Sequence, residues 1–307
     1  MIYYIIPHLA RTGGIKVALQ HIHILRNSGY PSEGIIMSNS HGVSSPFSRY
    51  DTPTLHMYPH MPSISPEDTL VFIWPLDFPA FENIVCKKVY FSQGCISVND
   101  MPGAVAPFEQ YVANDPNMGC LAVSNNTRSY NAIAYKKESA LVRNWIDTQV
   151  FKPGQSVQKR IGMINHRHNY DPHIGNLLIE NGFTILDIGG SEEDVARLMG
   201  SCDYFIQCSP GLWNGYEHTE GFPLPGAEAM ASGAILLTYN TKGVLEYAFD
   251  KINSVVFETP EELLDRLKIL EENTEEKESL REMGIKTIQT KFDAQTILKE
   301  LIKGLQL

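Results

Sequence analysis

Short apolar runs alternate with amphipathic helical patterns along the first half of the chain. The apolar run from Ile2 to Ile6 precedes Gly13 and Gly14, and apolar residues then recur at helical spacing up to Gly29. Strands are predicted at 1–7, 34–37, 70–73, 88–91, 121–123 and 140–142, and helices at 15–25, 78–85, 106–112 and 127–135. Region 38–66 is predicted to be mostly loop, with a short strand at 55–58. Such alternation is typical of a parallel sheet with helices on both faces.

A second alternating series follows segment 144–157, which contains Pro153 and Gly154 and lacks a sustained pattern. Its strands are predicted at 160–164, 184–186, 204–207, 234–238 and 254–257, and its helices at 173–181, 192–199 and 223–231. From Pro260 onward the pattern is helical almost to the end. We therefore expect two doubly wound α/β domains, 1–150 and 151–307, with the helical tail in the second domain.

The composition of the chain counts against several classes of function. The chain has 307 residues, 43% of them apolar, and 35 acidic against 25 basic residues, which counts against general nucleic-acid binding. No apolar run reaches membrane-spanning length, and the N-terminal run lacks a basic leader, so it is interpreted as a strand. Five cysteines without a CxxC pair indicate reduced thiols and a cytoplasmic protein. Four histidines, His23, His41, His56 and His60, lack the spacing of a metal site, and no metal is expected.

Candidate chemistry concentrates in stretch 220–230. Glu220 and Glu228 bracket a loop rich in Gly and Pro, and Pro225 suits the first turn of the helix that follows. The N–H groups of that turn form a natural site for a phosphate or a sugar hydroxyl. Alternatively, Glu220 belongs to a polar loop and Glu228 complements the helix dipole. The Gly13–Gly14 pair likewise either admits a ligand to the backbone or makes a tight turn.

Several stretches together resemble the retaining glycosyltransferases of the GT-B fold, the class with an E-x7-E motif that includes many lipopolysaccharide and exopolysaccharide enzymes. The matching pieces are Gly13–Gly14, 122–124, the crossing at 142–153, 187–190, the E-x7-E stretch, 232–236, 243–246 and the helical tail. The resemblance covers nearly all of the second half and a sparser part of the first. It implies two Rossmann-like domains facing across a cleft, with C-terminal helices, an acceptor side in 1–150 and a nucleotide-sugar donor side in 151–307.

The resemblance also assigns roles to single residues. It places Glu220 against the donor sugar and Glu228 on the nucleotide ribose, and it makes Arg167 the cation that neutralises the diphosphate. The donor would further meet Gly221, Phe222, Pro223 and Leu224 by their backbone, and Gly13 and Gly14 at the diphosphate. Two departures stand out. The family's partner Lys near Arg167 is absent, with His166, His168 and His173 in the region, and Gln93 stands where members often carry a sugar-binding His.

The implied activity is retaining transfer of a hexose from a UDP- or GDP-sugar to a hydroxyl, in polysaccharide, lipopolysaccharide or glycoconjugate synthesis. The donor is a substrate, and no cofactor is required. Expected acceptors are saccharides, lipid-linked saccharides or other compounds with a hydroxyl group. A modest basic cluster lies around the domain crossing, and peripheral contact with a membrane is a possible role for it. The missing Lys motivates one alternative, a nucleotide-sugar-binding protein without turnover. A phosphorylase or sugar-nucleotide epimerase is a further alternative with the same architecture.

Overall fold

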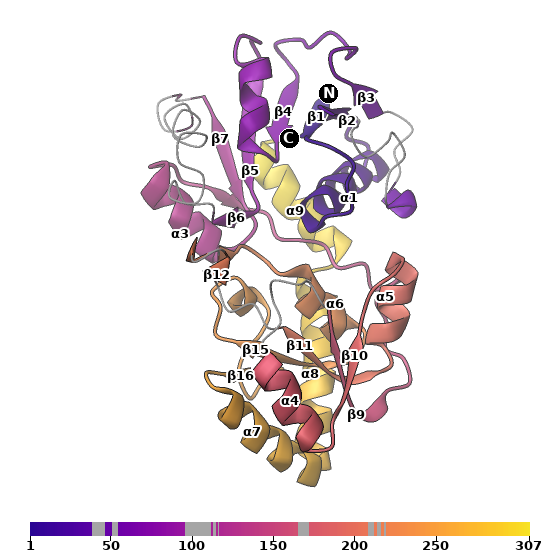
Figure 1. Cartoon of the computed structure of the whole chain (residues 1–307). Coiled ribbons are helices and arrows are strands. Elements are labelled where there is room, and N and C mark those ends of the chain that lie inside the picture. Colours follow the sequence, from indigo (N-terminus) through magenta and orange to yellow (C-terminus); the bar gives the residue numbers. More distant parts are fainter. Residues whose placement is uncertain are drawn as a thin grey trace. The chain divides into compact units, whose positions relative to one another are not determined.

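Strands and helices alternate along both halves of the chain in the computed structural model (Figure 1). The structure describes residues 1–38, 47–50, 55–95, 112, 115, 117–164, 172–207, 212–213, 216–217 and 219–307. Contacts divide the chain into two units. The first unit comprises Met1–Trp145 and Ala294–Leu307, and the second comprises Ile146–Asp293.

The first unit is built on a seven-stranded parallel sheet with the order β3-β2-β1-β4-β5-β7-β8. Its strands are β1 (Ile2–Ile6), β2 (Ser32–Ile36), β3 (Leu55–Met57), β4 (Thr69–Phe72), β5 (Lys87–Ser92), β7 (Gly119–Ala122) and β8 (Ala140–Leu141). A further short strand, β6 (Gly94–Cys95), follows β5. Every residue of β1 and β4 is buried, as expected for strands of a parallel sheet that is covered on both faces. The predicted strands and the parallel sheet are confirmed.

Helices and turns cover this sheet. They are α1 (Gly13–Asn27), α3 (Asn125–Ala134) and α9 (Ala294–Leu305), with 3-10 helices η1 (Ser48–Tyr50) and η2 (Pro75–Phe81). Ser124 caps α3 by accepting the Thr127 N–H at 3.1 Å. The helix predicted at 78–85 is wrong in type and position, because Pro79 lies inside η2 and cannot donate a backbone N–H. The helix predicted at 106–112 lies almost wholly outside the described residues.

The last helix departs from the predicted domain division. Figure 1 shows α9 beside α1, and α9 also contacts β7 and β8, all in the first unit. Its apolar face, with Ile297, Leu301 and Leu305, is fully buried. Segment 1–150 therefore corresponds to the first unit within a few residues, whereas the tail predicted for 151–307 is divided between the units after Asp293.

The second unit contains a five-stranded parallel sheet with the order β10-β9-β11-β15-β16. Its strands are β9 (Val157–Met163), β10 (Thr184–Asp187), β11 (Cys202–Gln207), β15 (Ile235–Tyr239) and β16 (Ser254–Phe257). Short strands β12 (Leu212–Trp213), β13 (Tyr216–Glu217) and β14 (Thr219–Glu220) follow β11. The helices are α4 (Pro172–Glu180), α5 (Glu192–Met199), α6 (Leu224–Ala231), η3 (Val244–Glu246), α7 (Pro260–Glu272) and α8 (Thr274–Lys291).

Both faces of the second sheet are covered. Ile235 and Leu237 of β15 share a core with side chains of α4 and α7. Leu236, between them, points the other way, and its Cδ1 lies 3.3 Å from the Cβ position of Gly226 in α6. The helix α6 therefore packs on the opposite face, and its first turn is held near the end of β11.

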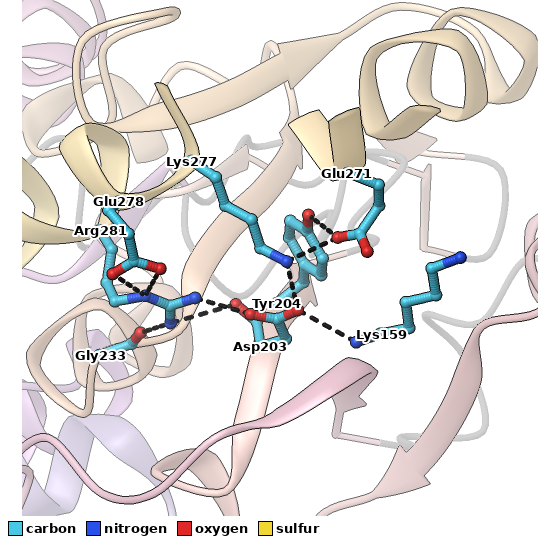
Figure 2. Close-up of polar contacts among 8 residues, drawn as sticks. All are labelled: Lys159, Asp203, Tyr204, Gly233, Glu271, Lys277, Glu278 and Arg281. Carbon is cyan, nitrogen blue, oxygen red and sulfur yellow. Dashed lines mark hydrogen bonds and ion pairs between the residues drawn. The ribbon is translucent and has the colours of Figure 1, made fainter. Parts of the chain in front are cut away.

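A buried network of charges fixes α8 to β11 (Figure 2). Asp203 of β11 accepts hydrogen bonds from Lys277 Nζ and from an Arg281 nitrogen, both at 2.6 Å. Lys277 Nζ also donates to Glu271 Oε1 at 2.6 Å, and Tyr204 Oη donates to the same oxygen at 2.6 Å. Asp203 is 3% exposed, so its charge is balanced by these two cations rather than by water.

Candidate functional site

The E-x7-E stretch lies beyond β11, at the point where the strand order of the second sheet reverses. The chain runs from β9 outward to β10 and then returns to β11, β15 and β16 on the other side of β9. Ligands of open α/β sheets bind outside the carboxyl ends of the strands at such a reversal. Glu220 ends β14, and Pro223 immediately precedes the first residue of α6. Pro225 lies in the first turn of α6, as predicted.

Glu220 and Glu228 differ in exposure. The side chain of Glu228, in the second turn of α6, is 6% exposed, whereas Glu220 is exposed. Both carboxylates act on the phenol of Tyr247: its pKa is raised well above the ordinary value, first by burial and then by the charges of Glu220 and Glu228. The structure thus brings the two carboxylates within electrostatic reach of one buried side chain.

Tyr247 also fixes the loop that joins Glu220 to α6. Its hydroxyl donates to the carbonyl oxygen of Pro223 at 2.7 Å, and its ring packs on Phe222 with centroids 5.0 Å apart. Phe222 packs in turn on Phe292 at 5.3 Å. This anchoring holds the backbone before α6 in place and leaves little freedom to the turn that would meet a ligand. Tyr247 has no local sequence signal that links it to a loop twenty-four residues earlier, so it is not among the predicted site residues.

Two glycines permit the close approach of backbone and side chains in this region. A Cβ on Gly243 would lie 2.0 Å from the carbonyl oxygen of Glu220 and 2.9 Å from the carbonyl carbon of Gly221. A Cβ on Gly226 would lie 2.5 Å from Gln207 Oε1 and 2.6 Å from Tyr247 Oη. Gly243 therefore requires glycine, because its obstacle is backbone, and the segment around it supports the backbone at Glu220 directly. At Gly226 the obstacles are side-chain atoms, which would have to shift. Gln207 Oε1 is buried and has no hydrogen-bond partner among the described residues.

The first unit carries a second group of predicted residues. Gly13 and Gly14 form the first turn of α1, after the extended residue Thr12. Gln93, which follows β5, donates its Nε2–H to the carbonyl oxygen of Gly14 at 3.3 Å. A Cβ on Gly14 would lie 3.2 Å from Gln93 Oε1, tighter than most such contacts. The structure therefore brings Gly14 and Gln93 together, although they are seventy-nine positions apart.

A cavity of about 550 Å³ opens beside this pair within the first unit. It is lined by the segments that follow β1, β4 and β5 and by the first turn of α1, including Thr12, Gly14, Trp74 and Gln93. Because β1 and β4 are neighbours in the sheet, the cavity lies at the carboxyl ends of adjacent parallel strands.

Not every predicted site residue can be located. Arg167, His168 and His166 lie outside the described residues. His173, the third histidine of that region, is exposed and its Nε2 lies 3.5 Å from a carboxylate oxygen of Glu261. His173 is therefore engaged with α7 at the surface.

Two ion pairs of the first unit join elements of the fold and lie outside the candidate site. His56 pairs with Glu33 at 2.7 Å between two neighbouring strands of the first sheet. Arg143 of the predicted basic cluster forms an ion pair with Glu300 of α9.

Among the described residues, no group of His, Cys, Asp or Glu side chains is arranged to hold a metal ion. In the same part of the chain, no helix has both the length and the apolar character needed to cross a membrane.

Several solved structures are similar to this chain over nearly its whole length. HepE from Anabaena, in complex with UDP and glucose, is 12% identical, with 99% of both chains covered and a TM-score of 0.78. Sucrose-phosphate synthase from Thermosynechococcus elongatus is 12% identical over 99% of this chain and 98% of its own, with a TM-score of 0.71. WaaG, a glycosyltransferase involved in lipopolysaccharide biosynthesis, is 13% identical over 99% of both chains, with a TM-score of 0.65. No curated protein sequence matches the chain.

The two parallel sheets with their helices, together with these matches, define the GT-B fold. Residues 161–287 match the family model described as "Glycosyl transferases group 1". The match spans most of the second sheet, the E-x7-E stretch and most of the helices of the second unit. The second unit is thus similar to the group 1 glycosyltransferases, and the whole chain is similar in fold to solved structures of the GT-B class.

Proposed function

We propose that the protein is a retaining hexosyltransferase that uses a UDP- or GDP-sugar as donor. The acceptor is a hydroxyl of a saccharide, a lipid-linked saccharide or another compound, in polysaccharide, lipopolysaccharide or glycoconjugate synthesis. The observation that carries this proposal is the placement of Glu220 and Glu228 around the start of α6, both within reach of Tyr247. The protein would act in the cytoplasm, with peripheral membrane contact if the acceptor is lipid-linked.

Each candidate residue has a role in this proposal. Glu220 orients the hydroxyls of the donor sugar, and Glu228 holds the ribose. The backbone of Gly221, Phe222, Pro223 and Leu224 meets the sugar and the diphosphate, where the N–H groups of the first turn of α6 face the negative charge. Gly13, Gly14 and Gln93 are assigned to donor binding as well, and Arg167 and His168 to neutralising the diphosphate.

The reaction exchanges one bond for another on the same face of the sugar. The bond between the anomeric carbon and the phosphate oxygen breaks, and the acceptor oxygen bonds to that carbon. The departing phosphate oxygen takes the acceptor proton, so no enzymic nucleophile is needed. Arg167 and the start of α6 stabilise the charge that develops on the leaving diphosphate, and a metal is not required for this. Turnover should therefore persist in excess EDTA.

The ligands of one similar structure support the choice of a nucleoside-diphosphate sugar as donor. HepE from Anabaena was crystallised with UDP and with UDP-glucose. At 12% identity this likeness concerns the fold.

The first test is a thermal-shift screen against UDP, GDP, ADP, CMP and dTDP. A nucleotide at about a hundred times its dissociation constant adds about 2.7 kcal/mol to the free energy of unfolding. We expect one nucleotide to stabilise the wild type and to lose most of this effect with Glu228→Ala. Glu282→Ala, an exposed position on α8, is the matched control and should respond like the wild type. If no nucleotide stabilises the folded protein, the donor assignment is wrong.

Turnover separates transfer from binding alone. Incubation with the stabilising nucleotide's hexose derivative should release the nucleoside diphosphate, and NMR of the product should show the donor's anomeric configuration. Tight nucleotide binding without any release of diphosphate would favour the alternative, a nucleotide-sugar-binding protein without turnover. An inverted product would exclude the retaining mechanism.

A further inference from the structure

The phenol of Tyr247 lies beneath the first turn of α6. Its side chain is fully buried, and a Cβ on Gly226, in that turn, would lie 2.6 Å from its hydroxyl oxygen. The hydroxyl donates a hydrogen bond to the carbonyl oxygen of Pro223 at 2.7 Å. Burial, and then the charges of Glu220 and Glu228, raise the pKa of the phenol well above its ordinary value. The hydroxyl therefore keeps its proton and stays a donor at neutral pH.

The backbone of Tyr247 holds the phenol in this position. The Tyr247 N–H donates to the carbonyl oxygen of Val244 at 3.0 Å, and the Tyr247 carbonyl oxygen accepts a hydrogen bond from Asn253 Nδ2 at 2.9 Å. Asn253 is 1% exposed, and its Nδ2 also donates to Thr287 Oγ1 of α8 at 3.0 Å. Because these contacts fix the residue from η3 and from α8, the hydroxyl has little freedom to leave the Pro223 carbonyl.

The bond from Tyr247 determines the orientation of the peptide group between Pro223 and Leu224. This peptide bond is trans, and in a planar trans peptide the carbonyl oxygen and the N–H point in opposite directions. The Pro223 oxygen points to the buried phenol, so the Leu224 N–H points away from it. Leu224 is the first residue of α6, and the N–H groups of a first turn have no acceptor within the helix. The Leu224 N–H is thus presented on the side of the loop opposite Tyr247.

The start of α6 has fewer N–H donors than an ordinary helix. Pro225, the second residue, has no N–H, which leaves more of the binding of a ligand to the Leu224 N–H. This end of a helix favours an anion, and a hydrogen bond to a charged phosphate oxygen is stronger than one between neutral groups. A reversed peptide would present the Pro223 carbonyl oxygen, with its partial negative charge, to the same anion.

We propose that Tyr247 is a positioning residue for the diphosphate of the donor. Its hydroxyl keeps the Pro223 carbonyl in the core, and the Leu224 N–H on the other side of the peptide binds a phosphate oxygen. Tyr247 itself does not touch the donor. This inference rests on the proposed glycosyl transfer and adds to it a residue outside the E-x7-E stretch. Without the hydroxyl, the peptide group is free to turn its carbonyl oxygen towards the diphosphate, which weakens binding.

The test compares two variants of the full-length protein that lose the same chemical group. Tyr247→Phe removes the hydroxyl and keeps the ring that packs on Phe222. Tyr204→Phe is the matched control, because Tyr204 is also fully buried in the second unit and its hydroxyl donates to Glu271 at 2.6 Å. Tyr204 belongs to the core on the face of the sheet opposite α6. Urea unfolding should show that both variants fold and that both lose stability.

Binding of ligands with and without phosphates separates positioning from a general effect on the fold. Titration calorimetry measures the dissociation constants of UDP and GDP, and NMR titration measures those of uridine and guanosine. We expect Tyr247→Phe to raise the dissociation constant of the diphosphate that binds about tenfold, and that of its nucleoside less than about twofold. Tyr204→Phe should match the wild type for both ligands. Unchanged diphosphate affinity in Tyr247→Phe, an equal loss for the nucleoside, or an equal loss in Tyr204→Phe would overturn the proposal.

NMR of protein containing ¹⁵N-labelled leucine reports on the Leu224 N–H directly. Its signal, assigned from a Leu224→Ile variant, should move downfield when the wild type binds the diphosphate, and should move less in Tyr247→Phe. If the diphosphate binds but leaves the Leu224 signal in place, the role of Tyr247 is wrong and the transferase function stands. If neither UDP nor GDP binds to the folded wild type, the proposed transfer fails and the role of Tyr247 fails with it.

Discussion

At the scale of single residues, the candidate donor site depends on contacts that leave no room for a side chain. Gly243 is the clearest case, because the Cβ of an alanine there would lie 2.0 Å from the carbonyl oxygen of Glu220. The obstacle is backbone, which cannot rotate aside, so the segment with Glu220 must shift. We expect Gly243→Ala to raise the dissociation constant of the donor nucleotide-sugar at least about tenfold and to cost about 1–3 kcal/mol of stability.

Isothermal titration with the nucleotide-sugar and urea unfolding measure the two effects. Gly189→Ala is the matched control, because a Cβ there meets no atom within 4 Å. Equal nucleotide-sugar affinity in the Gly243→Ala variant and the wild type would show that the backbone at Glu220 does not position the donor.

A second residue-scale prediction concerns pH. Burial alone would raise the pKa of Glu271, but hydrogen bonds from Lys277 and Tyr204 prevail and hold it below the ordinary 4.5. A carboxylate with a depressed folded-state pKa stabilises the protein above its unfolded-state pKa, and this contribution is lost as pH falls through the folded-state value. Glu271→Gln mimics the protonated form. The variant should be about 1.5–3 kcal/mol less stable than the wild type at pH 7.

That difference should shrink progressively once the pH falls below about 4.5, because the wild type then loses the same charge. Urea unfolding of both proteins between pH 3 and pH 7 measures it. A difference that stays constant across this range would mean that the carboxylate is not charged in the folded protein.

At the scale of elements, the network in Figure 2 connects β11 to α8, and Asp203 is its centre. Asp203→Asn leaves Lys277 and Arg281 partly buried with less compensating charge. We expect it to lower the free energy of unfolding by about 3–5 kcal/mol, measured with urea at pH 7. Glu278→Gln removes another partner of Arg281, but that carboxylate is 52% exposed and should cost less than about 1 kcal/mol. Similar losses in the two variants would contradict a central role for Asp203.

Elements also show how far the sequence could predict the structure. Buried strands such as β1 and β4 were predictable, because continuous apolar runs are characteristic of parallel sheets. The E-x7-E stretch and the start of α6 were predictable from local chemistry, with Pro225 in the first turn. Tyr247 and the bond between Gln93 and Gly14 were not, because they join segments distant in sequence. The 3-10 helix η2 differs from the helix predicted at 78–85, because Pro79 inside it cannot donate a backbone N–H.

At the scale of the whole molecule, the end of the chain stabilises the unit in which the chain begins. An amphipathic pattern predicts that α9 is helical but does not specify which sheet its apolar face covers. The structure places Gly304 so close to β7 that a Cβ would lie 2.7 Å from Leu121 Cδ2 and 3.1 Å from Val142 Cγ2. Lys87 Nζ also donates to the carbonyl oxygen of Leu305 at 2.5 Å. The first unit is therefore incomplete without residues 294–307.

Removing residues 294–307 should accordingly destabilise the first unit far more than the second. The deletion exposes the surface of α1, β7 and β8 that α9 covers and removes three fully buried side chains, Ile297, Leu301 and Leu305. Each buried leucine or isoleucine contributes about 1.5–3 kcal/mol, so the loss is comparable to the whole stability of a typical domain. Limited proteolysis followed by mass spectrometry should find rapid cleavage within 1–145, while 146–293 stays protected. Equal protection of the two segments would mean that α9 is dispensable. If the two domains were simply residues 1–150 and 151–307, the deletion would leave segment 1–145 protected. Because α9 packs on the first unit, we expect cleavage in that segment instead.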